Sequence, residues 1–260
     1  MPEPTDEDLI LIRSEGPIRI VTLNRPDALN ATNTPLHTAV SNVWRRLAED
    51  HDASVVVLTG AGRAFSAGGD FAMMKQLNED AAFREVVMEE VRRIILDMLR
   101  FPLPVVAAVN GPAVGLGCSL ALSADHVLLS DKAKLGDPHL NVGLVPGDGG
   151  VVLWPFYTSL LKVKEYLFTG KLIAPDDAVA MGLANRVVPH DELMNEAMAF
   201  AEVLASKPRK ALQDTKRALN SYIETQSRGP MEIAIQAENQ SMASPEHTKF
   251  VREQAAKAEG

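Results

Sequence analysis

The residues best suited to chemistry are concentrated between Lys134 and Pro155. This stretch holds one imidazole, His139, and two carboxylates, Asp137 and Asp148, in a segment that is otherwise apolar and rich in glycine and proline. A neutral imidazole, with an unperturbed pKa of about 6.5, is a competent base at neutral pH, and a carboxylate on its second nitrogen would fix the tautomer. We therefore expect His139 and Asp148 to form a His–Asp pair on the floor of an active site.

A structural role is the alternative for each of these side chains. Asp148 precedes the apolar run Val151 to Trp154 and could cap a helix there. His139 could be a loop histidine without a chemical role. The other histidines fall in predicted helices or at the edges of strands and helices, and we expect all of them to be structural: His37, His51, His126, His190 and His247.

Two turns rich in small residues are predicted to present backbone N–H groups to a ligand. They run from Ser66 to Asp70 and from Ala113 to Cys118, each where a predicted strand gives way to a helix. Glycine lets the backbone approach a ligand closely, and a helix N-terminus leaves donors unsatisfied. Two such donors converging on one point would form an oxyanion hole. Glycines that only turn the chain are the alternative.

Composition argues against several classes of protein. The net charge is −8 and no basic stripe is present, so a nucleic-acid partner is not expected. No run approaches the roughly 18 apolar residues of a membrane span, and the acidic N-terminus does not resemble a signal peptide. Cys118 is the single cysteine, which rules out an internal disulfide and fits a reducing cytoplasm. No Cys/His cluster has the spacing of zinc ligands.

Common catalytic motifs are also missing. The sequence has no P-loop and no Gly-x-Ser-x-Gly elbow. Gly111, Gly115 and Gly117 do not have the spacing of a dinucleotide fingerprint. Nucleotide hydrolysis, serine hydrolase chemistry and nicotinamide chemistry therefore lose their main support.

The elements that must position these residues alternate between strands and helices. A helix is predicted over 34–49, with Thr34 as N-cap and Pro35 in its first turn, and further helical sequence runs from the glycine loop at 60–69 to Arg100. From Asp191 onward the chain reads as helix, with prolines at helix starts, Pro230 among them. The predicted strands are 9–13 and 18–23, which form a hairpin, and 54–59, 105–109, 126–130 and 185–188. This alternation favours an α/β fold.

Four segments together resemble the enoyl-CoA hydratase/isomerase (crotonase) family: residues 24–30 (Asn-Arg-Pro-Asp-Ala-Leu-Asn), 64–70, 104–118, and 167–170 with 178–187. The resemblance implies a crotonase-type spiral of ββα repeats in residues 1–190 and a C-terminal helical region, 191–260, for capping and oligomerisation. It also implies a homotrimer or a dimer of trimers. The substrate would be a coenzyme A thioester, bound without a metal or redox cofactor.

The resemblance also implies roles for individual residues. The thioester carbonyl would accept hydrogen bonds from the N–H groups of Ala67 and Leu116, so that the site stabilises an enolate. The residues implied in substrate binding are Ala28, Ser66, Ala67, Gly68, Gly69, Asp70, Gly115, Leu116 and Ser119.

The sequence departs from the family's hydratases at two positions. They place one glutamate directly after the Gly-x-Gly-Cys turn and a second in a later loop, where this chain has Ser119 and His139. We therefore expect an enzyme that acts on acyl-CoA through His139 and Asp148 rather than through two glutamates. Two alternatives remain. One is a β-diketone C–C hydrolase, since the Pro-His and Val-Pro-Gly-Asp-Gly pieces resemble that branch of the family. The other is a non-catalytic acyl-CoA binding relative.

Overall fold

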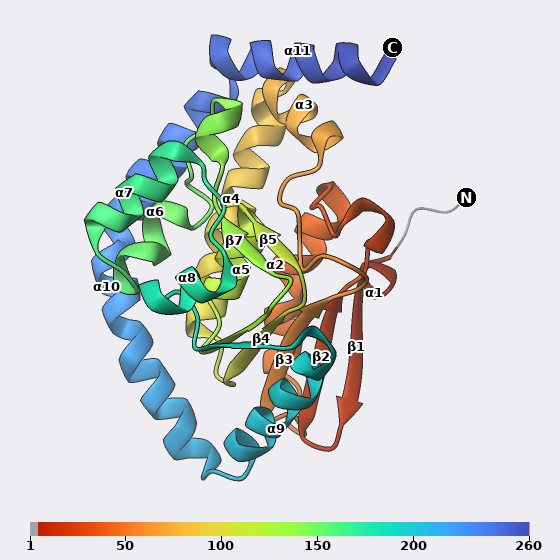
Figure 1. Ribbon diagram of the computed structural model, residues 1–260, viewed down its shortest axis with the longest axis vertical. Coiled ribbons are helices and arrows are strands. Elements are labelled where there is room, and N and C mark those ends of the chain that lie inside the picture. Colours follow the sequence, from red (N-terminus) through yellow and green to blue (C-terminus); the bar gives the residue numbers. More distant parts are fainter. Residues whose placement is uncertain (1–4, 260) are drawn as a thin grey trace.

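A six-stranded sheet forms the centre of the computed structural model, which describes residues 5–259 (Figure 1). Its first two strands are antiparallel and all other neighbours are parallel. The strand order is β1 (Ile10–Glu15), β2 (Ile18–Leu23), β3 (Val55–Gly60), β4 (Val105–Val109), β6 (His126–Ser130) and β8 (Arg186–Val188). All six predicted strands, including the hairpin, are therefore confirmed, and the fold is α/β.

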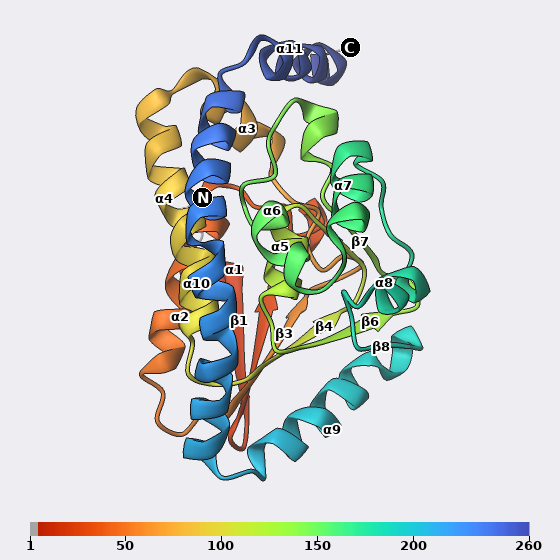
Figure 2. The ribbon, with the colours of Figure 1, turned by 90° about the vertical axis from the view of Figure 1, so that its left-hand side faces the viewer.

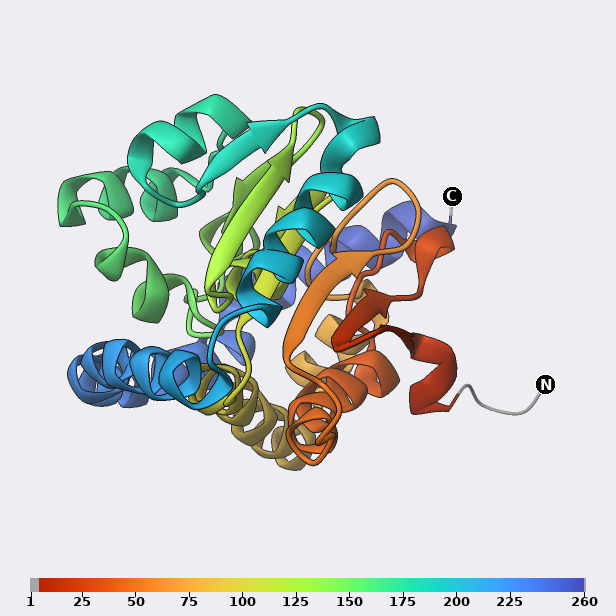
Figure 3. The same cartoon turned by 90° about the horizontal axis from the view of Figure 1, so that it is seen from below.

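Both faces of this sheet are covered by helices, which explains why its strands are nearly continuous apolar runs. Along β3, Val56 and Leu58 belong to one hydrophobic core, whereas Val55 and Val57 belong to the other. Helices α2 (Thr34–Ala48) and α4 (Ala81–Arg100) pack on the first face. Helix α9 (Leu193–Ala205) packs on the second, and Figure 3 shows the two layers. The first C-terminal helix thus covers a sheet face of its own chain.

A second, two-stranded sheet was not predicted. It pairs β5 (Pro112–Val114) with β7 (Lys134–Gly136) in parallel, and Gly115 N extends the pairing by donating to Gly136 O at 2.9 Å. Strands of three residues are too short to show a period of two in the sequence. This small sheet places the turn at Gly115 directly beside the stretch that carries His139.

The remaining helices surround the sheets. The predicted helical sequence up to Arg100 is interrupted at Asp80, whose side chain accepts from Phe83 N at 3.0 Å and caps α4. Helix α2 is capped by Asn33 rather than by Thr34, because the Asn33 side chain accepts from Leu36 N. The other helices are α1 (Asp6–Leu9), α3 (Phe71–Glu79), α5 (Leu116–Leu122), α6 (Gly150–Leu153), α7 (Leu160–Thr169), α8 (Pro175–Met181), α10 (Arg209–Met242) and α11 (Pro245–Glu259).

The long helix α10 corrects one expectation. Pro230 was predicted to start a helix but lies inside α10. A proline in a helix interior removes one hydrogen bond and leaves a carbonyl without its donor. The freed carbonyl is that of Gln226, which is exposed, so solvent can satisfy it. The helix therefore continues through the proline.

Helix α10 runs alongside α4 and reaches the region of the catalytic candidates (Figure 2). Its buried Lys216 anchors it, because Nζ donates to Leu103 O at 2.8 Å and lies 2.7 Å from Asp125 Oδ2. Helix α10 is thus joined to the core by an ion pair whose lysine is buried. Over residues 5–259, no helix combines the length and the apolar character needed to cross a bilayer.

Candidate active site

The imidazole of His139 lies among three carboxylates. The residue opens a 3-10 turn, His139–Val142, soon after β7. Its Nδ1 is hydrogen-bonded to Oδ1 of Asp137, a residue only 2% exposed. The partner that holds the ring is therefore Asp137, to which the sequence had given no specific role.

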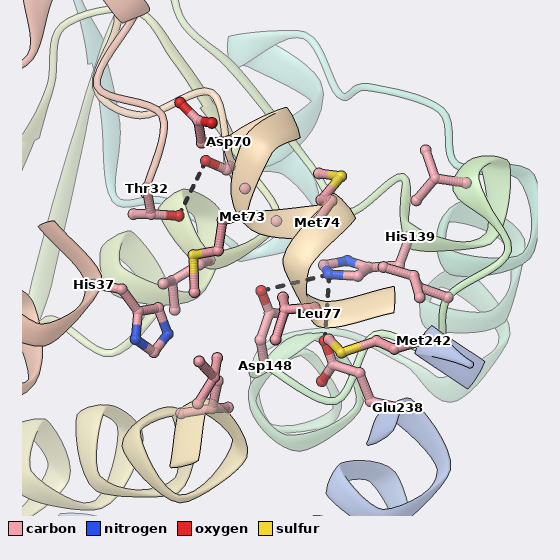
Figure 4. A pocket seen from close by; sticks show the side chains of 18 of the residues that line it. Thr32, His37, Asp70, Met73, Met74, Leu77, His139, Asp148, Glu238 and Met242 are labelled. Carbon is pink, nitrogen blue, oxygen red and sulfur yellow. Dashed lines mark hydrogen bonds and ion pairs between the residues drawn. The ribbon is translucent and has the colours of Figure 1, made fainter. Parts of the chain in front are cut away.

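The second nitrogen of the ring faces two other acids. Nε2 lies 3.6 Å from Asp148 Oδ2 and 3.8 Å from Glu238 Oε1. Dashed lines in Figure 4 mark both contacts. The expected partner Asp148 is thus within ion-pair range of the imidazole but beyond hydrogen-bond length. Asp148 does not cap a helix, because the N-cap of α6 is Gly149 and no side-chain cap bond is present there.

Glu238 was not among the predicted site residues. It belongs to α10 and is 2% exposed. Its Oε2, like Asp148 Oδ1 and Asp137 Oδ2, is buried without a hydrogen-bond partner among residues 5–259. Buried acids that lack donors are expensive when ionised, so protons must be shared within this cluster.

The pKa shifts follow from this burial. Burial opposes the charge on His139, but the carboxylates of Asp137, Asp148 and Glu238 outweigh it and raise its pKa well above the usual value. Burial raises the pKa of Asp148 to about 7, against the opposing effect of His139. Burial and the charge of Asp148 raise the pKa of Glu238 well above its usual range. At neutral pH the imidazole is charged, and Asp148 is the group poised to exchange a proton.

The two glycine turns meet beside His139. A Cβ placed on Gly115, where φ is +54°, would lie 3.2 Å from His139 Cε1 and 3.9 Å from Gly68 Cα. A Cβ on Gly68, where φ is +89°, would lie 3.0 Å from Val114 O. Both positions combine a positive φ with close contact, so they require glycine.

The free N–H groups of these turns differ from those expected. Ala67 N donates to Leu29 O at 3.0 Å, so this donor is already used inside the protein. Gly69 N and Leu116 N have no backbone or side-chain acceptor within residues 5–259. Leu116 is the first residue of α5, where helical N–H groups have no partner in their own helix. The available donor on the first turn is therefore Gly69 in place of Ala67.

The turns and the charged cluster border one cavity of about 120 Å³. Most of its other lining is apolar and comes from α3 and α4, including Met73, Leu77, Val87, Met88 and Val91. The predicted site residues that line it are Ala67, Gly68, Gly69, Asp70, Gly115, Leu116, His139 and Asp148. Its volume and lining suit a short apolar or weakly polar group.

Three predicted binding residues do not line this cavity. Ala28 lies in a 3-10 turn, and Ser66 is fully buried with its hydroxyl donating to Asn30 O at 2.8 Å. Ser119 is 1% exposed, and its Oγ has no partner among the described residues. Asp70 lines the cavity but also caps α3, since it accepts from Ala72 N at 2.9 Å.

A metal ion is a further possibility for Asp137, His139 and Asp148, because one ligand atom of each lies within 4.8 Å of the others. However, Asp137 contacts Nδ1 and Asp148 is nearest to Nε2. One imidazole cannot direct both nitrogens at the same ion. The two acids therefore suit proton exchange with the ring better than coordination.

An α/β core with a long C-terminal helix and a cavity between two glycine turns places the chain in the crotonase fold class. The family model described as enoyl-CoA hydratase/isomerase matches residues 13–257. A short-chain-enoyl-CoA hydratase of Clostridium acetobutylicum is 36% identical over 81% of this chain and 80% of that protein. The chain belongs to the enoyl-CoA hydratase/isomerase family.

Solved structures agree with this assignment. The crystal structure of an enoyl-CoA hydratase/isomerase from Mycobacterium paratuberculosis is similar with a TM-score of 0.92 and 46% identity, covering 95% of this chain and 98% of that one. A monofunctional enoyl CoA isomerase from M. smegmatis has a TM-score of 0.72 and 30% identity, covering 86% and 98%. Family members of similar fold thus carry both hydratase and isomerase names.

Proposed function

We propose that this protein acts on an acyl-CoA thioester and moves a proton at the carbon next to the thioester carbonyl through an enolate. The observation that carries this proposal is that a group titrating near neutrality, Asp148, borders the same cavity as two free backbone donors, Gly69 N and Leu116 N. Relatives named short-chain-enoyl-CoA hydratase and crotonyl-CoA hydratase support an acyl-CoA thioester as the substrate.

In the proposed step, the thioester oxygen accepts hydrogen bonds from Gly69 N and Leu116 N. The Asp148 carboxylate takes a proton from the α-carbon, and the electron pair of the broken C–H bond moves to the carbonyl oxygen. The imidazolium of His139 stabilises the carboxylate before transfer, and its orientation is held by Asp137. In a substrate with a β,γ double bond, Asp148 returns the proton to the γ-carbon while the double bond shifts to the α,β position, which is isomerisation. In a substrate with a leaving group on the β-carbon, the enolate re-forms the carbonyl, makes the α,β double bond and expels that group, which is a lyase-type step.

Two-glutamate hydration is not supported by the site. Ser119 lies outside the cavity lining, and His139 occupies the position of the second glutamate. A β-diketone C–C hydrolase is the second candidate. The Asp148 carboxylate beside the His139 ring favours it, since a carboxylate that titrates near neutrality can take a proton from a water that attacks a carbonyl.

The test is a substrate panel on the wild type and on His139→Ala: hydration of crotonyl-CoA, isomerisation of enoyl- and dienoyl-CoA, and cleavage of a cyclic 1,3-diketone. We expect isomerisation, reduced about 10²–10⁴-fold in the variant. The exposed His51→Ala is the matched control. Diketone cleavage without thioester turnover would replace the proposal by the second candidate, and thioester binding without any turnover would indicate a non-catalytic relative.

A further inference from the structure

A second histidine–acid pair borders the same cavity. His37 of α2 is 3% exposed and lines the cavity, although it was predicted to be structural. Its Nδ1 lies 2.7 Å from Glu90 Oε2, and Thr38 Oγ1 donates to Glu90 Oε1 at 2.9 Å. Both oxygens of Glu90 are thus used to hold this ring and its neighbour.

The second ring nitrogen of His37, Nε2, is free to contact a ligand. Nε2 of His37 has no hydrogen-bond partner among residues 5–259. The cavity that His37 lines is largely apolar, and its lining includes Met73, Met88 and Val91. A ligand that fills the cavity would cover this nitrogen, so a ligand that supplies a hydrogen-bond partner for it is favoured over one that does not.

The orientation of the ring is fixed by its acid. Burial alone would raise the pKa of Glu90, but the hydrogen bond and charge of His37, with smaller effects of Thr38 and Arg93, hold it below its usual value. The ionised carboxylate accepts from Nδ1–H, which leaves Nε2 as the free position of the imidazole. The pair is therefore built to present one defined polar atom.

His37 and His139 occupy opposite sides of the cavity in Figure 4, with the side chains of Met73 and Leu77 between them. A substrate whose reacting carbon lies near His139 would extend its acyl chain along this apolar wall toward His37. We propose that His37 is a specificity residue whose Nε2 hydrogen-bonds an oxygen on the acyl chain, so that the substrate is an acyl-CoA with a hydroxyl group remote from the thioester. This inference rests on the proposed function, which places a thioester in the cavity.

A hydroxyl group suits the site in either state of the ring. It donates to Nε2 of a neutral imidazole and accepts from Nε2–H of a protonated one. A methyl group at the same place can do neither. Sites built to hydrogen-bond a substrate hydroxyl discriminate strongly against the analogue that lacks it, because their own polar atom is then left unpaired.

The test compares two thioesters of equal length, one ending in a methyl group and one with a terminal hydroxyl, by calorimetric Kd and by kcat/KM. We expect the wild type to prefer the hydroxylated thioester by at least about 10-fold. His37→Leu should lose or invert this preference while it still binds the methyl analogue. Glu90→Gln, whose amide oxygen can still accept from Nδ1–H of His37, should keep part of the preference for the hydroxylated thioester. His51→Leu should keep this preference fully.

Equal affinity of the wild type for the two thioesters would overturn the inference, even if both are turned over. An unchanged preference in a folded His37→Leu would overturn it too. If His37→Leu does not fold, two other variants decide: Glu90→Gln, and His37→Gln, whose polar group reaches less far than the imidazole. The inference then predicts that both variants prefer the hydroxylated thioester over the methyl analogue by a smaller ratio than the wild type does. Absence of turnover on both thioesters with the selective binding intact would refute only the proposed reaction.

Discussion

Glu238 Oε1 lies 3.8 Å from His139 Nε2, although one residue belongs to α10 and the other to the turn after β7. Both side chains are enclosed, and Asp148 completes the cluster at 3.6 Å from the same nitrogen. Helix α10 is thus part of the candidate active site as well as a cover for the core. The charge state of this cluster determines how stability and activity depend on pH.

The first prediction concerns Glu238 and stability. Its folded pKa is raised above the unfolded value, so the folded protein binds this proton more tightly. The resulting stability is fully present below the unfolded pKa and is lost as pH rises through the folded pKa. Glu238→Gln keeps the shape and stays neutral, so its melting temperature should fall less than that of the wild type as pH rises above the usual range of a glutamate. Parallel curves for the two proteins would contradict the assignment.

The second prediction concerns Asp148 and rate. With a pKa of about 7, the Asp148 carboxylate becomes available as a base as pH rises through neutrality. We expect kcat/KM of the wild type to increase through about pH 7 and then level off. Asp148→Asn should lose about 10²–10⁴-fold in rate and also lose this inflection. The exposed Asp177→Asn should reproduce the wild-type profile, and an inflection retained in Asp148→Asn would assign it to another group.

The third prediction uses two glycines with the same φ of +54°, Gly115 and Gly16. Alanine at either position strains the backbone by about 1–2 kcal/mol. Only at Gly115 would the new methyl group press against His139 Cε1, at 3.2 Å, whereas a Cβ at Gly16 meets nothing within 4 Å. Gly115→Ala should therefore lose both thermal stability and activity, and Gly16→Ala only stability. Equal activity in the two variants would show that the ring tolerates the contact.

Much of the fold and part of the site could be predicted from the sequence for a physical reason. Strands such as Val55–Gly60 are buried on both faces, so they appear as uninterrupted apolar runs between glycine turns and helices. The turns at Gly68 and Gly115 were recognised because positive φ and close contact demand glycine.

The features of the site that could not be predicted from the sequence depend on contacts between segments that are distant in the chain. Glu238 lies in an ordinary amphipathic helix, and only the packing of α10 brings it to His139. Whether Ala67 N or Gly69 N is free depends on Leu29 O, thirty-eight positions before Ala67 and supplied by a separate turn. Such long-range partners leave no local periodicity or motif in the sequence.

The fourth prediction tests the oxyanion donor at Leu116. The residue opens α5, and proline is tolerated in the first turn of a helix, where its missing N–H would have had no helical partner. Leu116→Pro therefore deletes the donor while the helix can still form. We expect kcat to fall about 10²–10³-fold, because a single oxyanion donor contributes that much. Leu116→Met keeps the N–H and a similar volume, so it should lose little activity. Circular dichroism and thermal melting check that both variants fold, and turnover is measured on the thioester that the wild type converts best. Full activity in a folded Leu116→Pro would remove Leu116 N from the mechanism and leave Gly69 N as the donor to test next.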